Sequence, residues 1–277
     1  MSKLKFAKPN KPELHVVSLS GGKDSTAMLL RMIEEGMRID LIMFCDTGLE
    51  FPALYRHLDK LQKEIGMPIV RISADHTFEH YMLNYEVREK KQESHTHHRG
   101  LGWPGPMYRW CTREFKERPR QKYLRPLQAK YQVIEYVGLA ADEGYRLERK
   151  NNQGERCRHP LVEWGMTEAD CLQYCYEHGY DWEGLYDYFD RVSCWCCPLQ
   201  SLANLRILYE HFPELWEQLK DWDNRCWRTF KADFTVEQLA KRFDLEKAWL
   251  DEGKDINSKE FHTELQKIME EDTCTKK

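Results

Sequence analysis

The feature that most constrains the fold is a short apolar run that leads into two glycines and then into a helix-like segment. The run LHVVSL covers residues 14–19, and STAMLLRMIEEG covers 25–36 with apolar residues at helical spacing. An apolar run of this length, bounded by a glycine turn, is typical of a buried strand. A strand, a glycine turn and a helix form the first half of a βαβ unit, which predicts an α/β protein with a parallel sheet.

The strand–helix alternation continues through the first half of the chain. Further strands are expected at 39–45, 67–73 and 132–140, and helices at 51–66, 76–90 and 112–130. Strands that alternate with helices pair in parallel and are covered on both faces. The sequence therefore predicts a parallel sheet with helices on both of its faces.

The second half of the chain changes character near residue 163, where the pattern becomes helical and aromatic. We expect an α/β domain over 1–162 and a helical region over 163–277, with one continuous fold as the alternative. The segment 91–107 has no periodicity and is expected to be a loop. From about 254 the chain is polar and predicts a weak helix with a frayed end. Packing in helix cores is favoured over base stacking for the seven tryptophans beyond residue 163.

Composition limits the class of protein. The 277 residues are 41% apolar and 32% charged, with a net charge of -4. No apolar run approaches the roughly 18 residues of a membrane span, and no secretory signal is visible. We expect a cytoplasmic protein with no membrane partner. The charge argues against a protein coated in basic surface for nucleic acid, but a local basic groove stays open, and basic residues concentrate in 113–130.

The loop SGGKDS, residues 20–25, has the residue types of a phosphate site. Gly21 and Gly22 permit a tight turn with bare N–H groups, and the following helix adds the positive end of its dipole. Lys23 supplies a positive charge, and Asp24 is a candidate for holding Mg²⁺ or orienting the loop. The neighbouring hydroxyls are Ser20, Ser25 and Thr26. The spacing differs from the Walker loop and from G-x-G-x-x-G, and a phosphate site is favoured over a structural turn.

These residues resemble a known family. SGGKDS after a first strand is similar to the PP-loop of the ATP pyrophosphatases, the adenine nucleotide alpha-hydrolase-like superfamily. FCDTGLEFP resembles a stretch of the phosphoadenosine phosphosulfate reductase family. The resemblance continues in RWCTREFK (109–116), GLAADEGYRLER (138–149), HPLVEW (159–164) and CWCCP (194–198). Together the motifs run from residue 14 to about 200 in the family's order.

The resemblance implies a Rossmann-like (HUP-type) sheet that binds ATP with Mg²⁺. Members that use ATP cleave it between the α and β phosphates, adenylate an oxygen of the substrate and release pyrophosphate. The residues implied in nucleotide binding are Ser18, Ser20, Gly21, Gly22, Lys23, Asp24, Ser25, Thr26, Asp46 and Arg149. The implied catalytic residues are Lys23, Asp24, Asp46 and Arg146.

Two of these assignments have a structural alternative. Asp46 at the end of the second strand is equally well explained as an Asx-turn before the helix at 51. Arg146 and Arg149 are three apart and share a helix face, so they could clamp a phosphate or form a salt-bridged helix start. Ala140 and Gly144 stand where the family usually has Arg and Ser. The assignment of a phosphate-binding role to Arg146 and Arg149 is weaker for that reason.

The chain holds ten cysteines, and three of them lie within 194–197. Cys194 and Cys197 form a C-x-x-C unit that can place two thiolates on one metal. The resemblance implies a 4Fe-4S cluster on Cys111, Cys194 and Cys197, with Cys196, Cys157 or an open position as the fourth. Tetrahedral Zn²⁺ and catalytic or buried thiols remain alternatives. Core packing is expected for Cys45, Cys171, Cys175 and Cys226, and a solvated loop for His95, His97 and His98.

The complete loop and the lack of the family's terminal E-C-G-x-H motif favour ATP hydrolysis over sulfate reduction. The leading interpretation is an ATP-dependent, AMP-forming sulfurtransferase-like enzyme. Its partners would be a sulfur donor, such as a cysteine desulfurase, and an acceptor substrate. Nucleic acid is one candidate for that acceptor. The alternatives are a thiol-dependent sulfonucleotide reductase and a non-catalytic nucleotide-binding subunit with a structural metal.

Overall fold

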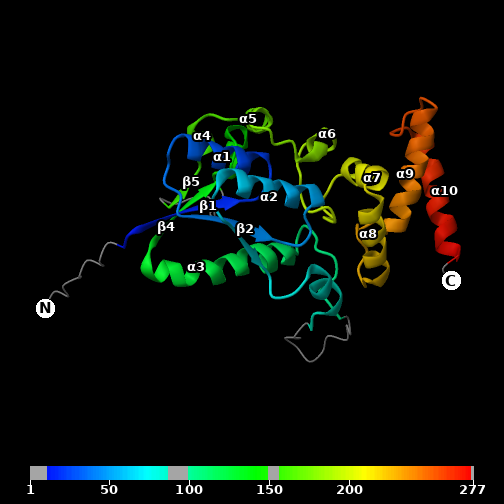
Figure 1. The fold of residues 1–277 in the computed structure, drawn as a ribbon. Helices are drawn as coiled ribbons and strands as arrows, with labels where there is room; N and C mark the ends of the chain where they lie inside the picture. The colour runs from blue at the N-terminus through cyan, green and yellow to red at the C-terminus, as the bar shows by residue number, and fades with distance from the viewer. Residues whose placement is uncertain (1–10, 87–98, 149–155, 276–277) are drawn as a thin grey trace. The chain divides into compact units, whose positions relative to one another are not determined.

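The computed structural model describes residues 11–86, 99–148 and 156–275, with side chains up to residue 270 (Figure 1). The chain divides into two compact units. The first comprises Met1–Asp75 and Cys111–Cys194, and the second comprises His76–Trp110 and Trp195–Lys277. Each unit is therefore assembled from two separate stretches of sequence.

The first unit is built on a five-stranded sheet in which every strand is parallel to its neighbours. The spatial order is β3-β2-β1-β4-β5. The strands are β1 (Glu13–Leu19), β2 (Leu41–Asp46), β3 (Ile69–Ser73), β4 (Gln132–Val137) and β5 (Cys157–Arg158). The strand order reverses between β1 and β4, and ligands of open parallel sheets bind at the carboxyl ends of the strands beside such a reversal.

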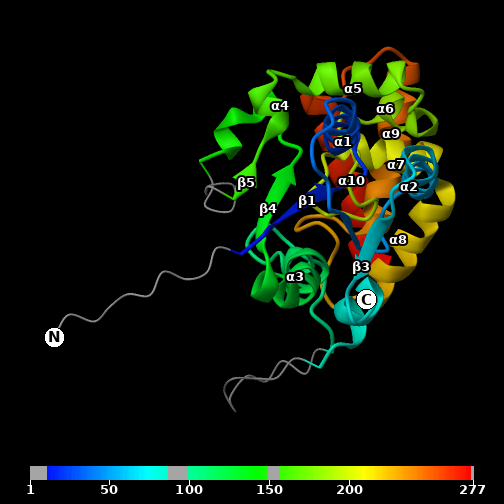
Figure 2. The ribbon, with the colours of Figure 1, turned by 60° about the vertical axis from the view of Figure 1, so that its left-hand side comes forward.

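Helices cover both faces of this sheet, which confirms the predicted α/β class. Figures 1 and 2 place α1 (Lys23–Glu34) and α2 (Pro52–Ile65) on one face and α3 (Arg118–Lys130) on the other. Under α3, the buried residues form one apolar cluster of Val16, Met43, Ile72, Leu124 and Val133. Burial of such side chains contributes about 1.5–3 kcal/mol each, so the central strands are fixed from both sides.

The predicted elements of the first half are confirmed within a few residues, with three differences. The fourth strand ends at Val137 instead of 140. The expected helix at 112–130 begins as a π-helical turn, η2 (Thr112–Glu117), and continues as α3. In the segment 76–90 the regular part is η1 (His80–Asn84), and residues beyond 86 lie outside the description.

The structure divides the chain at other positions than the predicted boundary at 162/163. The short elements η3 (Ala141–Arg146), α4 (Pro160–Glu163), η5 (Trp182–Gly184) and α6 (Leu185–Tyr188) belong to the first unit. So does α5 (Glu168–Glu177), which packs along α1. Hydrophobic periodicity marks this region as helical, but it does not say which core a helix joins.

The second unit is helical, with α7 (Leu202–His211), α8 (Pro213–Arg225), α9 (Val236–Asp251) and α10 (Lys259–Thr275). Asp223 is buried at its centre and accepts hydrogen bonds from Trp103 Nε1 at 3.0 Å, Phe230 N at 2.8 Å and Val236 N at 2.8 Å. These bonds join residues 76–110 to the helices and explain why that segment leaves the sheet unit. No helix of the described residues is long and apolar enough to cross a membrane.

Candidate nucleotide and thiol site

The predicted phosphate loop lies between β1 and α1, at the carboxyl edge of the sheet. Gly21 has a φ of +79°, and a Cβ there would lie 2.9 Å from Leu54 Cδ2. Only glycine adopts this backbone conformation without strain, and the close approach of α2 adds a steric reason. Gly22 is the N-cap of α1, so the loop lies at a helix N-terminus, where the first N–H groups have no partner within the helix itself.

The hydroxyl groups of the loop are partly committed to internal bonds. Ser20 Oγ lies 2.9 Å from Ser25 Oγ, and Ser25 Oγ also lies 3.2 Å from the carbonyl oxygen of Gly22, to which it donates. Thr26 is fully buried, and its Oγ1 lies 3.1 Å from His57 Nε2. The role of Ser20 and Ser25 at the phosphates stays a prediction, and the Thr26 hydroxyl is engaged with His57 of α2.

A segment far along the chain, which we call the brace, forms two hydrogen bonds to the loop. Trp182 Nε1 donates to the carbonyl oxygen of Gly21 at 2.7 Å, and Tyr186 Oη accepts from Lys23 N at 2.8 Å. Trp182 and Glu183 have φ values of 49° and 55°. Non-glycine residues in the left-handed region are uncommon and cost free energy, which the surrounding contacts must offset. The sequence offered no signal for this brace beyond the aromatic character of the region.

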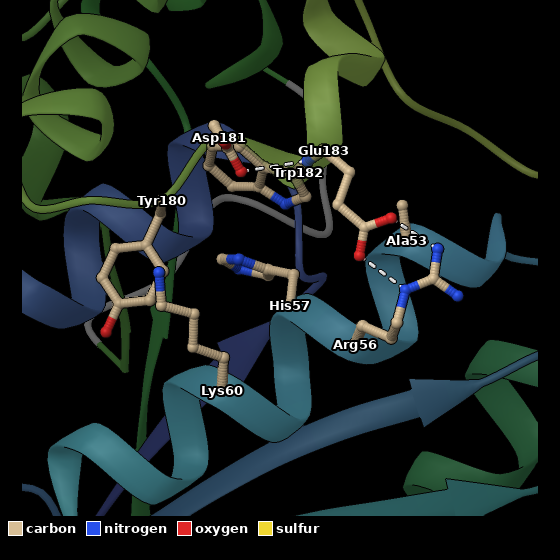
Figure 3. Close-up of a pocket in the computed structure, with 8 residues that line it drawn as sticks. All are labelled: Ala53, Arg56, His57, Lys60, Tyr180, Asp181, Trp182 and Glu183. Carbon is tan, nitrogen blue, oxygen red and sulfur yellow. Dashed lines mark hydrogen bonds and ion pairs between the residues drawn. The ribbon is translucent and has the colours of Figure 1, made fainter.

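His57 links the brace to the loop at the wall of a cavity of about 270 Å³ (Figure 3). Its ring stacks on Trp182 with 4.4 Å between the centroids, and Figure 3 shows both rings facing the cavity together with Tyr180 and Lys60. Burial, with a smaller repulsion from Lys60, lowers the pKa of His57 to about 4. The imidazole is therefore neutral near pH 7 and acts as a packing and hydrogen-bonding group.

Lys23 is 5% exposed and lies among carboxylates. Its ammonium group pairs with Glu168 of α5 and lies 3.5 Å from Asp24 Oδ1. Although burial acts against the charge, the hydrogen bond to Glu168 and the charge of Asp24 raise the pKa of Lys23. The sequence reasoning missed Glu168, which lies 145 residues from Lys23 in the chain.

Asp24 is the most perturbed carboxyl group of the loop. Burial, with smaller contributions from Glu168 and Glu143, raises its pKa to about 6 against the opposing charge of Lys23. Its Oδ1 is buried and accepts no hydrogen bond among the described residues. Its nearest cation is the Lys23 ammonium group at 3.5 Å, so this carboxylate oxygen retains capacity for a cation such as Mg²⁺.

The segment after β4 approaches the loop closely. A Cβ on Gly138 would lie 2.8 Å from Ser25 Cα, so the two backbones are in contact there. Farther along, Asp142 accepts from Glu168 N at 3.1 Å and thereby holds the start of α5. Arg146 Nη1 donates to Glu143 Oε1 at 2.5 Å, as the salt-bridged alternative predicts, and Arg149 lies outside the described residues.

Two further predicted residues have local partners. Asp46 Oδ1 accepts from Gly48 N at 2.9 Å and from Tyr55 Oη at 2.8 Å, which is an Asx-turn at the end of β2. Ser18 Oγ donates to Glu135 Oε1 at 2.6 Å, within the sheet. Their nucleotide-binding role therefore stays a prediction, and each side chain already has a structural one.

Three thiols of the first unit gather around Lys116 at the carboxyl end of β2. Burial acts to lower the pKa of Lys116, but the charges of Cys194, Glu50, Cys45 and Cys111 raise it. Cys194 Sγ lies 3.9 Å from Glu50 Oε1 and 3.9 Å from Thr47 Oγ1. Burial raises the pKa of the Cys45 thiol, although the nearby charges of Lys116 and Arg120 act in the opposite direction. Cys45 is thus part of a polar group and not only of the core.

The predicted metal ligands are distributed over the two units. Cys111 and Cys194 lie in the first unit, whereas Cys196 and Cys197 belong to the second. Over the described ranges, no three His, Cys, Asp or Glu side chains are arranged to hold a metal ion. A 4Fe-4S cluster or Zn²⁺ on these cysteines stays a prediction, and the histidines His95, His97 and His98 lie outside the described residues.

A parallel α/β sheet with a glycine loop at the carboxyl end of its first strand is the arrangement typical of phosphate-binding α/β proteins. The comparison with family models identifies which one. The Phosphoadenosine phosphosulfate reductase domain matches residues 14–200, more than half of the chain. The chain belongs to the phosphoadenosine phosphosulfate reductase family.

Individual relatives are distant. An uncharacterised protein of Methanocaldococcus jannaschii is 25% identical over 259 residues, and a second one is 27% identical over 211 residues. The matches cover 90% and 74% of this chain and 46% of each of those proteins, so the chain spans about half their length. An uncharacterised 37.8 kDa protein of Escherichia phage 186 is 24% identical over 76% of this chain and 74% of its own.

One solved structure that aligns with this chain is that of a U34-tRNA thiolase from Methanococcus maripaludis with its 4Fe-4S cluster. It aligns with a TM-score of 0.37 at 14% identity, over 85% of this chain and 72% of that chain.

Proposed function

We propose that this protein is an ATP-dependent, AMP-forming enzyme of the sulfurtransferase type. The observation that carries the proposal is the loop Ser20–Ser25, whose buried Lys23 and half-buried Asp24 follow the carboxyl end of β1. The three thiols around Lys116 lie near the carboxyl end of the adjacent strand β2. Nucleotide chemistry and sulfur chemistry are thereby supported on neighbouring strand ends of one unit.

The loop residues have defined roles in this proposal. Backbone N–H groups at the start of α1 bind phosphate oxygens, and the helix dipole favours their negative charge. Glu168 now holds the Lys23 ammonium group. On binding, phosphate oxygens replace that carboxylate, and Lys23 neutralises the charge that develops on the leaving pyrophosphate. Asp24 supplies an oxygen ligand for Mg²⁺.

The reaction then has two steps. An oxygen of the acceptor bonds to the α-phosphorus as the bond to the bridging oxygen breaks, and pyrophosphate leaves. A sulfur nucleophile, delivered by a donor protein, next bonds to the activated carbon as AMP leaves with the oxygen. The thiols Cys111 and Cys194 beside Lys116 are the groups of this chain suited to handle sulfur.

The second candidate function is reduction of a sulfonucleotide to sulfite with a thiol as the reductant. Membership of the phosphoadenosine phosphosulfate reductase family favours it. In that reaction the loop binds the nucleotide without splitting ATP. A thiolate attacks the sulfate sulfur as the S–O bond to the nucleotide breaks, and a second thiol then releases sulfite as the two thiols form a disulfide.

The products distinguish these functions. The purified chain would be incubated with Mg²⁺ and α-labelled ATP, together with sulfide and a mixed oligonucleotide pool, and in parallel with adenylyl sulfate and a thiol. AMP and pyrophosphate that disappear in Lys23→Ala, and persist in Arg125→Ala on the exposed side of α3, support the proposal. Sulfite release supports the reductase. Formation of ADP, or binding with no turnover of either substrate, contradicts both.

A further inference from the structure

Trp227 differs from the other tryptophans in its exposure. Sequence reasoning favours core packing for the tryptophans of the second half, and Trp182, Trp195, Trp216 and Trp222 are buried as expected. Trp227 is 48% exposed. All nine tryptophans lie within the described ranges, and the other eight are buried or half-buried. A single exposed apolar side chain is ordinary on a protein surface, so a ligand is indicated only by the groups that lie beside this indole.

The indole of Trp227 is held in place and does not hang free. A Cβ on Gly102 would lie 2.8 Å from Trp227 Cζ2, and Gly102 has a φ of +67°. Trp227 Nε1 also donates to the carbonyl oxygen of Gly100 at 3.3 Å. The ring is thus anchored on a glycine backbone while Trp227 remains 48% exposed, and this anchoring lowers the entropy cost of binding.

A tight turn beside Trp227 adds exposed side chains. Gly105 and Tyr108 exchange two backbone hydrogen bonds of 3.1 and 3.2 Å. The turn exposes Met107 and Tyr108 to 98% and 42%. Arg228 Nη2 would lie 3.1 Å from a Cβ on Gly105, so its guanidinium group rests against this turn. We call Met107, Tyr108, Arg109, Trp227 and Arg228 the Trp227 surface.

The charge of this surface is positive. The stretches GLGWPGPMYRW (100–110) and NRCWRTFKA (224–232) hold Arg109, Arg225, Arg228 and Lys231 and no acidic residue. Arg225 is paired with Glu79 and Asp221. No carboxylate of the described residues pairs with Arg109 or Arg228. Two unneutralised guanidinium groups beside an exposed indole and a phenol therefore favour an anionic ligand with aromatic faces.

We propose that the Trp227 surface binds a single-stranded nucleic acid, with a base stacked on Trp227 and backbone phosphates on Arg228 and Arg109. Base stacking on aromatic side chains contributes about 1–3 kcal/mol per base and needs an unpaired base face. A duplex hides its base faces, which favours the single strand. The inference rests on the proposed function and deepens it, because it names the class of acceptor.

Fluorescence anisotropy of labelled single-stranded RNA and DNA of about 16 nucleotides tests the proposal on the full chain. Affinity is expected to fall about tenfold in Trp227→Ala and less in Trp227→Phe. Arg228→Ala should also reduce the slope of log affinity against log salt by about 0.7. Circular dichroism and thermal unfolding check that each variant is folded. If Trp227→Ala does not fold, Trp227→Phe tests the stacking, and Arg228→Ala compared with Arg228→Lys tests the charge.

Matched controls lie in the other unit. Arg125→Ala removes an exposed cation from α3, and Tyr176→Ala removes an aromatic side chain that is 37% exposed. Neither should change the affinity. Equal losses in the controls, no effect of Trp227→Ala and Arg228→Ala, equal affinity for duplex, or no saturable binding would each overturn the proposal and leave the surface to a protein or a free nucleotide.

Failure of this inference is distinguishable from failure of the proposed function. Oligonucleotide binding is measured without ATP, and AMP formation is measured separately with Lys23→Ala as its control. A chain that forms AMP but binds no strand refutes the Trp227 surface alone. A chain that binds the strand through Trp227 but forms no AMP refutes the reaction alone.

Discussion

At the residue scale, the carboxylate groups beside Lys23 keep its buried ammonium group charged. The ammonium group is buried, and a buried charge requires a partner of opposite sign. Glu168 is that partner when no phosphate is bound. The loop is therefore kept ready for an anion, because its cation is already desolvated and only the counter-charge has to be exchanged.

Replacing Glu168 with glutamine should tighten ATP binding. The amide removes the closer of the two negative charges beside Lys23 and leaves Asp24 in place, so we expect an affinity gain of about threefold to tenfold, the scale of a partly exposed ion pair. Isothermal titration with ATP and Mg²⁺ measures it. Glu177→Gln, on the exposed side of the same helix, is the matched control and should leave the affinity unchanged. Weaker binding in Glu168→Gln would mean that Glu168 itself contacts the bound nucleotide or its metal.

His57 should destabilise the fold in acid. Its pKa is about 4 in the folded chain and about 6.5 when unfolded. As the pH falls from about 6.5 to 4, the unfolded chain takes up the proton first, so stability is lost, by about 3 kcal/mol in total. Asp24 acts in the opposite sense over part of this range, because burial raises its folded pKa to about 6.

Urea unfolding of the wild type and of His57→Gln across this pH range separates the two groups. The amide retains a partner for Thr26 but does not titrate, so the difference between the two curves isolates His57. We expect that difference to shrink, or to change sign, as the pH falls below 6.5. Parallel curves would show that His57 is not neutral and buried in solution.

At the element scale, the sequence predicted the parts that periodicity encodes. Buried strands and amphipathic helices leave regular apolar spacing, and the glycine loop leaves a local motif, so β1 to β4, α1 to α3 and the loop position were predictable. The brace was not. Trp182 and Tyr186 reach the loop from more than 160 residues away, and local spacing carries no information about such tertiary partners. The same reason hid Glu168 and the grouping of Cys45 with Lys116.

The contact between the end of β4 and the start of α1 predicts a strong effect for Gly138→Ala. The added Cβ would lie 2.8 Å from Ser25 Cα, and backbone atoms cannot move aside cheaply. We expect a loss of unfolding free energy of about 1–3 kcal/mol and weakened nucleotide binding, because α1 must shift. Urea unfolding measures the loss. Gly144→Ala is the control, since nothing lies within 4 Å of its added Cβ. Equal stability of the two variants would contradict the close approach.

At the scale of the whole molecule, two cores share one chain that crosses between them three times. The first unit contains both candidate groups, the loop at 20–25 and the thiols around Lys116. The second contains the Asp223 centre and the Trp227 surface. The C-x-x-C motif spans the boundary, because Cys194 ends one unit and Cys197 lies in the other. A sequence boundary drawn by helix content alone cannot reveal a unit built from two separate stretches.

This division predicts where nucleotide binding stabilises the chain. Hydrogen exchange would be compared with and without α,β-methylene ATP, which cannot be cleaved at the proposed bond, in the presence of Mg²⁺. Amides within 19–35 and 166–188 should gain protection, because the loop, α1, α5 and the brace are joined by the contacts of Gly21, Lys23 and Glu168. A ligand that binds only the folded site raises the free energy of local opening by its binding free energy, so the amides of that site exchange more slowly. Lys23→Ala should remove the effect. Protection confined to α9 and α10, with no change at 19–35, would place the nucleotide in the second unit and contradict the proposed site.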